Sequence, residues 1–445
     1  MSGLNREVLS KLHYLQHFNP LYMALSRIWS AFIIVAVLVA GFKCFFLGQS
    51  EIFSWMVIGK ASDPNNPLKI DGIIETCWTA VEICLKLIGV LALFIGFMSI
   101  AERAGGIRLL SKIIGPFFSK LFPELPKGHP AMGHMIMNFS ANLLGLDNAA
   151  TPFGLKAMQS LQEINPDKER ASNPQIMFLC LHAAGLNIIP VGVIAIRASQ
   201  HASNPTDVFI PCMIVTFVGT IAAMLIVSFK QKINLLQPVI LLWVLGISLL
   251  ITLLVLYVVR LDAAGVQSFS GVLSNGLILL VFFLIVLGGV YKKIDVFDAF
   301  IEGAKNGFET AIRIIPYLVG ILVAVSMLRT SGTFDVVING VKSFFALLGA
   351  DTRFVDGLPT ALIRPLSGGA ARGMMVSTMT TYGPDSFASR LSGIFQGASD
   401  TTFYVIAVYF GSVSIKNTRY AIGAMLLADL VGILTAITLA YLFFG

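Results

Sequence analysis

Polar and charged side chains interrupt four otherwise apolar segments of the sequence, and their types suit the binding of a small polar solute or ion. An ionisable residue inside an apolar segment is costly to bury and is therefore a functional candidate. Asp147 and Asp400 could carry a coupling charge, and Arg364 or Arg372 could hold a carboxylate or phosphate group through paired hydrogen bonds. The full set of candidates is Asn138, Asn142, Asp147, Asn148, Thr151, Asn187, Arg364, Ser367, Gly368, Arg372, Gln396, Ser399, Asp400, Thr401 and Thr402.

These candidates also have structural interpretations, which the sequence leaves open. Asp147 is a good N-cap for a short helix with Pro152 in its first turn. Arg364 could pair with Asp400 or cap the carbonyl end of a helix, and the threonines after Asp400 could join neighbouring transmembrane helices. A capped half-helix and a binding site are compatible, because a helix N-terminus also offers N–H groups to an anionic or polar solute.

Catalytic and metal-binding arrangements are not recognisable. His134 and His182 could relay protons, but each stands alone and is more typical of a histidine that packs between helices. The five cysteines are scattered without ligand spacing and are typical of a membrane core. The sequence therefore predicts no enzyme, no cofactor and no metal site.

Composition places these residues in a membrane protein. Hydrophobic residues make up 56% of the 445-residue chain and charged residues only 12%, against about 25% charged in soluble domains. This excludes a secreted enzyme, a nucleic-acid-binding domain and a disordered scaffold. The net charge of +7 is therefore assigned to loops at an anionic cytoplasmic leaflet, not to a nucleic-acid contact.

The apolar segments predict an all-α integral membrane fold of nine transmembrane helices and two re-entrant hairpins. The hairpins are predicted at 129–158 and 357–380, where small and polar residues interrupt apolar halves that are too short to cross a bilayer. Glycine and proline near Asn187 predict an unwound segment within the third span. The predicted spans are 28–48, 79–100, 175–195, 208–228, 235–258, 270–290, 308–328, 390–412 and 419–443.

The distribution of basic residues predicts the orientation. With re-entrant hairpins and a cytoplasmic N-terminus, most lysines and arginines fall in cytoplasmic loops, as the positive-inside rule requires. The N-terminus does not resemble a cleaved signal peptide, so the first apolar run is expected to remain as a transmembrane helix.

An internal repeat relates the two halves. Residues 79–90 (TAVEICLKLIGV) and 310–321 (TAIRIIPYLVGI) share 5 of 12 positions. Each is followed by an amphipathic stretch, a broken hairpin, a span containing polar residues and a final apolar span. Four predicted spans lie between the spans that contain these two segments, so the segments are an odd number of crossings apart and run in opposite directions through the membrane. The halves should therefore be inverted, as in secondary transporters. The predicted regions are an N-terminal amphipathic segment with the first helix (1–60), a first repeat (71–230), two connecting helices (231–300) and a second repeat (301–445).

Three stretches carry a family resemblance. The segment 132–158 (MGHMIMNFSANLLGLDNAATPFGLKAM) resembles the spore maturation protein A family. The segments 366–373 (LSGGAARG), 381–387 (TYGPDSF) and 396–404 (QGASDTTFY) resemble the spore maturation protein B family. Both belong to the group with a nucleoside-recognition, or Gate, domain. The resemblance implies a fused bacterial inner-membrane protein with hairpin-containing inverted repeats.

Two hypotheses about function follow. The first is a secondary transporter of an unidentified small polar solute (nucleoside-like, anionic or a cation), coupled to H⁺ or Na⁺. The second is a non-transporting membrane scaffold for envelope or spore-core maturation. The expected partners are membrane lipid, the solute and its coupling ion, with no nucleic acid, and formation of a homo-oligomer is left open.

Overall fold

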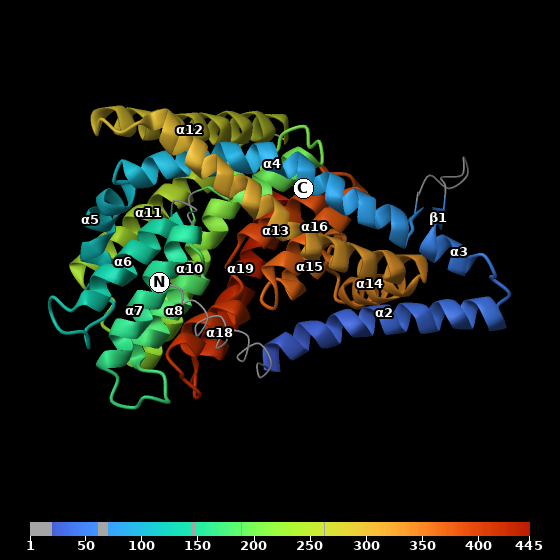
Figure 1. Cartoon of the computed structure of the whole chain (residues 1–445), viewed down its shortest axis with the longest axis horizontal. Coiled ribbons are helices and arrows are strands. Elements are labelled where there is room, and N and C mark those ends of the chain that lie inside the picture. Colours follow the sequence, from blue (N-terminus) through green and yellow to red (C-terminus); the bar gives the residue numbers. More distant parts are fainter. Residues whose placement is uncertain (1–19, 61–69, 144–146, 188, 262) are drawn as a thin grey trace, which may run out of the picture.

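A computed structural model describes residues 20–60, 70–143, 147–187, 189–261 and 263–445, and these ranges are almost entirely helical (Figure 1). Two short strands, β1 (Gly59–Lys60) and β2 (Ile70–Asp71), pair antiparallel. The all-α class predicted from composition is confirmed. The helices of the N-terminal part are α2 (Pro20–Phe46), α3 (Ile52–Val57), α4 (Ile73–Arg103), α5 (Gly106–Phe118), α6 (Pro130–Leu143), α7 (Asp147–Glu163), α8 (Asn173–Ala183), α9 (Val191–Ser199) and α10 (Phe209–Gln231).

The C-terminal part contains a second series of helices after two long connecting ones. The connecting helices α11 and α12 carry few buried side chains and many exposed apolar ones, as expected of surfaces that face lipid. The elements are α11 (Pro238–Val258), α12 (Ala263–Tyr291), α13 (Val296–Thr330), α14 (Thr333–Leu347), the 3₁₀ turn η1 (Arg353–Asp356), α15 (Leu358–Ile363), α16 (Gly368–Tyr382), α17 (Phe387–Gly397), α18 (Thr402–Ser412) and α19 (Ala421–Phe444).

Six described helices, α2, α4, α10, α11, α12 and α19, are long and apolar enough to cross a membrane, and they coincide with six of the nine predicted spans. The end of α13 and α14 together form a seventh candidate that is bent by 77°. The chain is therefore a multi-pass helical membrane protein.

Two predicted spans differ from the expected form. Segment 175–195 is divided into α8 and α9, with the unwound part where glycine and proline predicted it. Segment 390–412, predicted as a span that contains polar residues, is divided into α17 and α18. The block of short polar residues at 399–402 explains this second break, because such side chains compete for backbone hydrogen bonds and favour helix ends.

The same order of elements occurs twice. The series α4 to α10 comprises a long helix, an amphipathic helix, a helical pair, a broken helix and a final long helix, and α13 to α19 repeat it. Gly105 and Gly332 precede the two amphipathic helices, and both adopt left-handed backbone conformations that favour glycine. The internal repeat seen in the sequence therefore has a structural counterpart.

The equivalent helices α4 and α13 pack against each other in opposite directions. Arg103 at the end of α4 forms an ion pair with Glu302 near the start of α13. Further along, Gly307 of α13 lies against Ala92, so near that a Cβ atom on the glycine would come within 2.7 Å of the Ala92 backbone. Small residues here allow the close approach that joins helices in a membrane.

The equivalent helices α10 and α19 are also antiparallel. Gln231 at the end of α10 donates to the Tyr420 hydroxyl just before α19, and Val215 near the start of α10 lies against Gly432. With 23 residues, α10 is roughly 35 Å long at about 1.5 Å per residue. Features at its two ends are therefore far apart.

Candidate functional site

The two broken helices meet where their helical structure is interrupted. The Asp400 N–H donates a 2.8 Å hydrogen bond to the Ala183 carbonyl, which joins the α17–α18 break to the end of α8. Gly185 adopts φ +62°, and a Cβ atom there would lie only 2.9 Å from the Asp400 nitrogen. A glycine is needed at this position, both for the left-handed backbone and for the contact between the breaks.

The first helical pair contributes amides beside the α8 break. Asn138 Oδ1 and Asn142 Nδ2 lie 2.9 and 2.8 Å from Nδ1 of His182. The other ring nitrogen of His182 is 4.0 Å from Asp400 Oδ2. Asn138 also donates to the Ala150 carbonyl at 2.7 Å, which ties α6 to α7.

Tyr409 of α18 extends this amide–histidine group. Its ring packs edge to face on His182, with centroids 4.8 Å apart, and its hydroxyl hydrogen-bonds Thr151 and Asn138. Gly154 leaves room for the ring, because a Cβ atom there would come within 2.4 Å of Tyr409 Cε1. Tyr409 is not among the residues predicted for the site, because its position in an apolar stretch gives no signal.

The second helical pair contributes Arg364, which follows α15 directly. Arg364 Nη1 donates to Thr401 Oγ1 at 2.8 Å, and Nη2 donates to the Ser399 carbonyl. Ser367 caps α16 by accepting from the Ala370 N–H. A Cβ atom on Gly368 would lie 2.8 Å from both Arg364 Nη1 and Thr401 Oγ1, so the start of α16 closes over the guanidinium.

A carboxylate that sequence analysis missed completes this region. Asp429, in the first half of α19, accepts from Thr402 Oγ1 at 2.5 Å and from the Ser399 hydroxyl. A small cavity, wide enough for water-sized molecules, lies beside it and is also lined by Arg364 and Ser399. The signal was present in the sequence, because Asp429 is an ionisable residue within an apolar span.

The remaining candidates are less closely connected. Asn187 accepts from the Ile189 N–H within its own loop, and the buried Gln396 makes no hydrogen bond through Oε1 in the described part of the chain. Arg372 acts on Asp400 through its charge. Asp147 and Asn148 are the first residues of α7, but their side chains lie outside the described residues.

Asp400 is accessible as well as central. Its side chain is 42% exposed, whereas the neighbouring His182 side chain is only 6% exposed. The described residues contain no group of three or more His, Cys, Asp or Glu side chains placed to hold a metal ion. The site therefore offers a partly exposed carboxylate near an amide–histidine group and under the influence of the Arg364 guanidinium.

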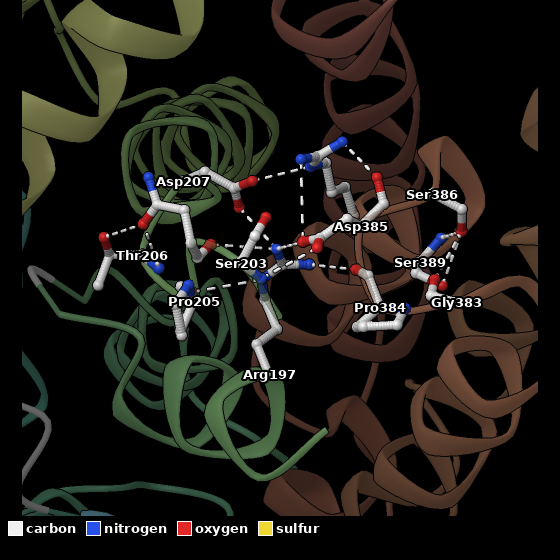
Figure 2. Close-up of polar contacts among 12 residues, drawn as sticks. Arg197, Ser203, Pro205, Thr206, Asp207, Gly383, Pro384, Asp385, Ser386 and Ser389 are labelled. Atoms are coloured by element: carbon white, nitrogen blue, oxygen red, sulfur yellow. Dashed lines mark hydrogen bonds and ion pairs between the residues drawn. The ribbon is translucent and has the colours of Figure 1, made fainter. Parts of the chain in front are cut away.

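A buried charged cluster joins the two series of helices at one end of α10 (Figure 2). Arg197 of α9 is fully buried; it pairs with Asp207 at 2.9 Å and with Asp385 at 3.4 Å. Arg390 of α17 contacts the other oxygen of Asp207 at 2.8 Å. The Arg197 guanidinium also donates to the Pro384 carbonyl at 2.9 Å, so it binds backbone of the second series directly.

The ionisation of Asp385 is favoured within this cluster. Burial acts to raise the pKa of its carboxyl, but hydrogen bonds from Ser203 and the charges of Arg390 and Arg197 outweigh it. Its pKa therefore lies below its ordinary value, and the group is a carboxylate at neutral pH.

A second contact joins the two series at the other end of α10, between the loop before α8 and the loop before α19. Lys416 pairs with Glu169 at 2.5 Å, and the Lys416 and Asn417 N–H groups both donate to the Glu169 carbonyl. Arg419 donates to the Ala171 carbonyl at 3.1 Å. The first contact joins the α9–α10 loop to the α16–α17 loop, and the second joins the α7–α8 loop to the α18–α19 loop. Each loop of the first contact therefore has its equivalent in the second contact, in the other series.

Comparison with known families agrees with this repeated structure. The nucleoside recognition (Gate) family matches the chain twice, over residues 84–200 and 311–416. These matches cover half of the sequence, one in each helical series. The chain belongs to the nucleoside recognition (Gate) family.

Two curated relatives in Bacillus subtilis (strain 168) each resemble part of this Gate-family chain. It is 45% identical to spore maturation protein B over 173 residues, which is 39% of this chain and 96% of that protein. It is 40% identical to spore maturation protein A over 156 residues, which is 35% of this chain and 80% of that protein. The resemblance predicted from the sequence motifs is confirmed. No solved structure matches the chain.

Proposed function

We propose that this protein is a secondary transporter of the bacterial inner membrane, built from inverted repeats, that moves a small polar solute through a site between its helix breaks. The observation that supports this most is the direct contact of the two breaks at Ala183 and Asp400, beside an Asp400 side chain that remains 42% exposed. Broken helices that meet around polar groups are typical of transporter binding sites.

The inversion of the repeats is supported by the helix directions. Both equivalent pairs, α4 with α13 and α10 with α19, pack antiparallel, and the two equivalent loop contacts lie at opposite ends of α10. In this proposal the pairs α6–α7 and α15–α16 enter and leave on the same side as re-entrant hairpins. Nine crossings then remain, and the N-terminus is cytoplasmic.

The roles in the site follow from the contacts. Asp400 is the accessible carboxylate that would bind the coupling H⁺ or Na⁺, and Nε2 of His182 lies 4.0 Å from its Oδ2, near enough to influence its charge. Asn138 and Asn142 orient that histidine. A solute with hydrogen-bonding groups, such as a nucleoside, would contact the amide side of the site.

A thermal-shift screen of the detergent-purified protein against nucleosides, small carboxylates, amino acids and monovalent cations tests this proposal. A ligand that binds the folded state raises its apparent stability by mass action. We expect a reproducible shift that is lost in Asp400→Asn and kept in the control Asp351→Asn, which changes an exposed loop residue. A thermal shift that persists in Asp400→Asn would show that Asp400 is not part of the binding site.

The second candidate is a non-transporting membrane scaffold. It is favoured by the charged contacts that join the two series at both ends of α10, and by the names of the relatives, which refer to spore maturation. A scaffold would not need Asp400. Full complementation of a deletion strain by Asp400→Asn, together with a screen without any shift, would favour this second function.

A further inference from the structure

The break between α17 and α18 presents oxygen atoms of the kind that bind a monovalent cation. Asp400 and its neighbours interrupt the helix, and this leaves the Ser399 carbonyl and the Thr401 hydroxyl directed at the same group. The carbonyl end of α17 carries a partial negative charge. The Asp429 carboxylate lines the same cavity as Ser399. Discontinuous helices of transporters use such carbonyls and helix ends to coordinate coupling cations.

A side chain of the protein already occupies this place. The Arg364 guanidinium reaches across from the end of α15 and donates to both oxygens, through Nη1 to Thr401 Oγ1 at 2.8 Å and through Nη2 to the Ser399 carbonyl. Arginine remains charged at every physiological pH. The group therefore supplies the positive charge that the break would otherwise obtain from solution.

The guanidinium is also confined. A Cβ atom on Gly368 would come within 2.8 Å of both Arg364 Nη1 and Thr401 Oγ1, so the first residue of α16 packs directly beside this hydrogen bond. A hydrated ion could not enter between Arg364 and its acceptors without displacing the whole side chain.

We infer that Arg364 is a tethered substitute for a monovalent cation, and that the native protein consequently does not bind sodium at the α17–α18 break. This inference rests on the proposed transport site, because it concerns the ion that would be coupled there. It also favours H⁺ over Na⁺ as the coupling ion, because sodium cannot bind at the α17–α18 break while Arg364 occupies it.

Binding of radioactive sodium to the purified protein, at constant ionic strength maintained with choline, tests the inference without knowledge of the solute. We expect no saturable binding by the wild type or by Arg364→Lys, which keeps the positive charge. Arg364→Ala should gain saturable sodium binding. Because this variant lacks a like charge a few ångströms from the ion, its affinity for sodium should exceed that of the wild type about 100-fold or more. The double variant Arg364→Ala/Asp429→Asn should lose this gain.

Arg364→Gln keeps a hydrogen-bond donor without the charge, and it replaces Arg364→Ala if the alanine variant is not monodisperse. Saturable sodium binding by the wild type that is weakened by Thr401→Val would overturn the inference. So would a folded Arg364→Ala or Arg364→Gln variant without any gain. Loss of solute binding in the screen above would refute the proposed transport but leave these sodium results unchanged, so the two failures are distinguishable.

Discussion

Substitution of Arg197 by alanine should strongly destabilise the protein, because this fully buried side chain holds the two helical series together. The guanidinium contacts Asp207 and Asp385, and it donates to backbone carbonyls at Pro384, Pro205 and Asn204. Its removal would leave two carboxylates to share Arg390 and would leave the carbonyls without that donor.

The magnitude follows from burial. Removal of one partner of a buried ion pair generally costs about 3–5 kcal/mol, since the remaining charge is stranded away from water. The pair Lys416–Glu169 at the other end of α10 is a matched control, because its side chains are 73% and 66% exposed. An exposed pair contributes only about 0–1 kcal/mol. Arg197→Ala should therefore cost several times as much as Lys416→Ala.

Thermal unfolding of the two variants and the wild type in one detergent measures this difference. We expect Arg197→Ala to lower Tm far more than Lys416→Ala does. Arg197→Lys should lie between them, since lysine restores the charge but not the planar donor fork. Equal decreases for the two alanine variants, or full rescue by lysine, would refute the reasoning that buried, forked contacts join the series.

Two further substitutions have signs that the structure determines. Gly154→Ala should lower Tm, since the new methyl group would lie 2.4 Å from Tyr409 Cε1 and overpacking costs about 1–3 kcal/mol. Gly133→Ala on α6 is its control, has open space around it and should not destabilise. Asp385→Asn should reduce stability at neutral pH. That loss should shrink as pH falls below 3.8, because the lowered pKa of Asp385 contributes stability only while the group is ionised; an unchanged difference between the variant and the wild type in acid would contradict this.

The membrane helices were predictable because local composition determines them. Six apolar runs were located from the sequence alone, and the helices that correspond to them need no partner to satisfy their backbone hydrogen bonds. The amphipathic stretch beginning at Ile107 and its counterpart at 334–348 were recognised for the same reason and form α5 and α14. Short-range patterns suffice where burial in lipid is the deciding force.

The site was predictable in its residue types but not in its connections. Arg364, Ser399 and Thr401 were candidates because they are polar residues in apolar segments, yet their hydrogen bonds join residues more than 30 positions apart. Of the roles considered for Arg364, capping the carbonyl end of a helix is the one that its contacts with the Ser399 carbonyl and Thr401 Oγ1 resemble. Binding of an anion stays a prediction. Arg197 lies just beyond the predicted span 175–195, and nothing in its local sequence shows that it contacts Asp385, nearly 190 residues later.

The proposed inversion explains why the accessible polar residues converge at a single place. Two copies related by a two-fold axis in the membrane plane can contact each other through equivalent points only where that axis passes. Features away from the axis must occur in pairs, as the helical pairs α6–α7 and α15–α16 and the loop contacts at the two ends of α10 do. The breaks instead contact each other directly, through Ala183 and Asp400. The equivalent helices α4 and α13, and α10 and α19, also contact each other. In the proposed inverted arrangement the axis therefore passes through the breaks as well, and a solute approaching from either side of the membrane would reach the same groups there.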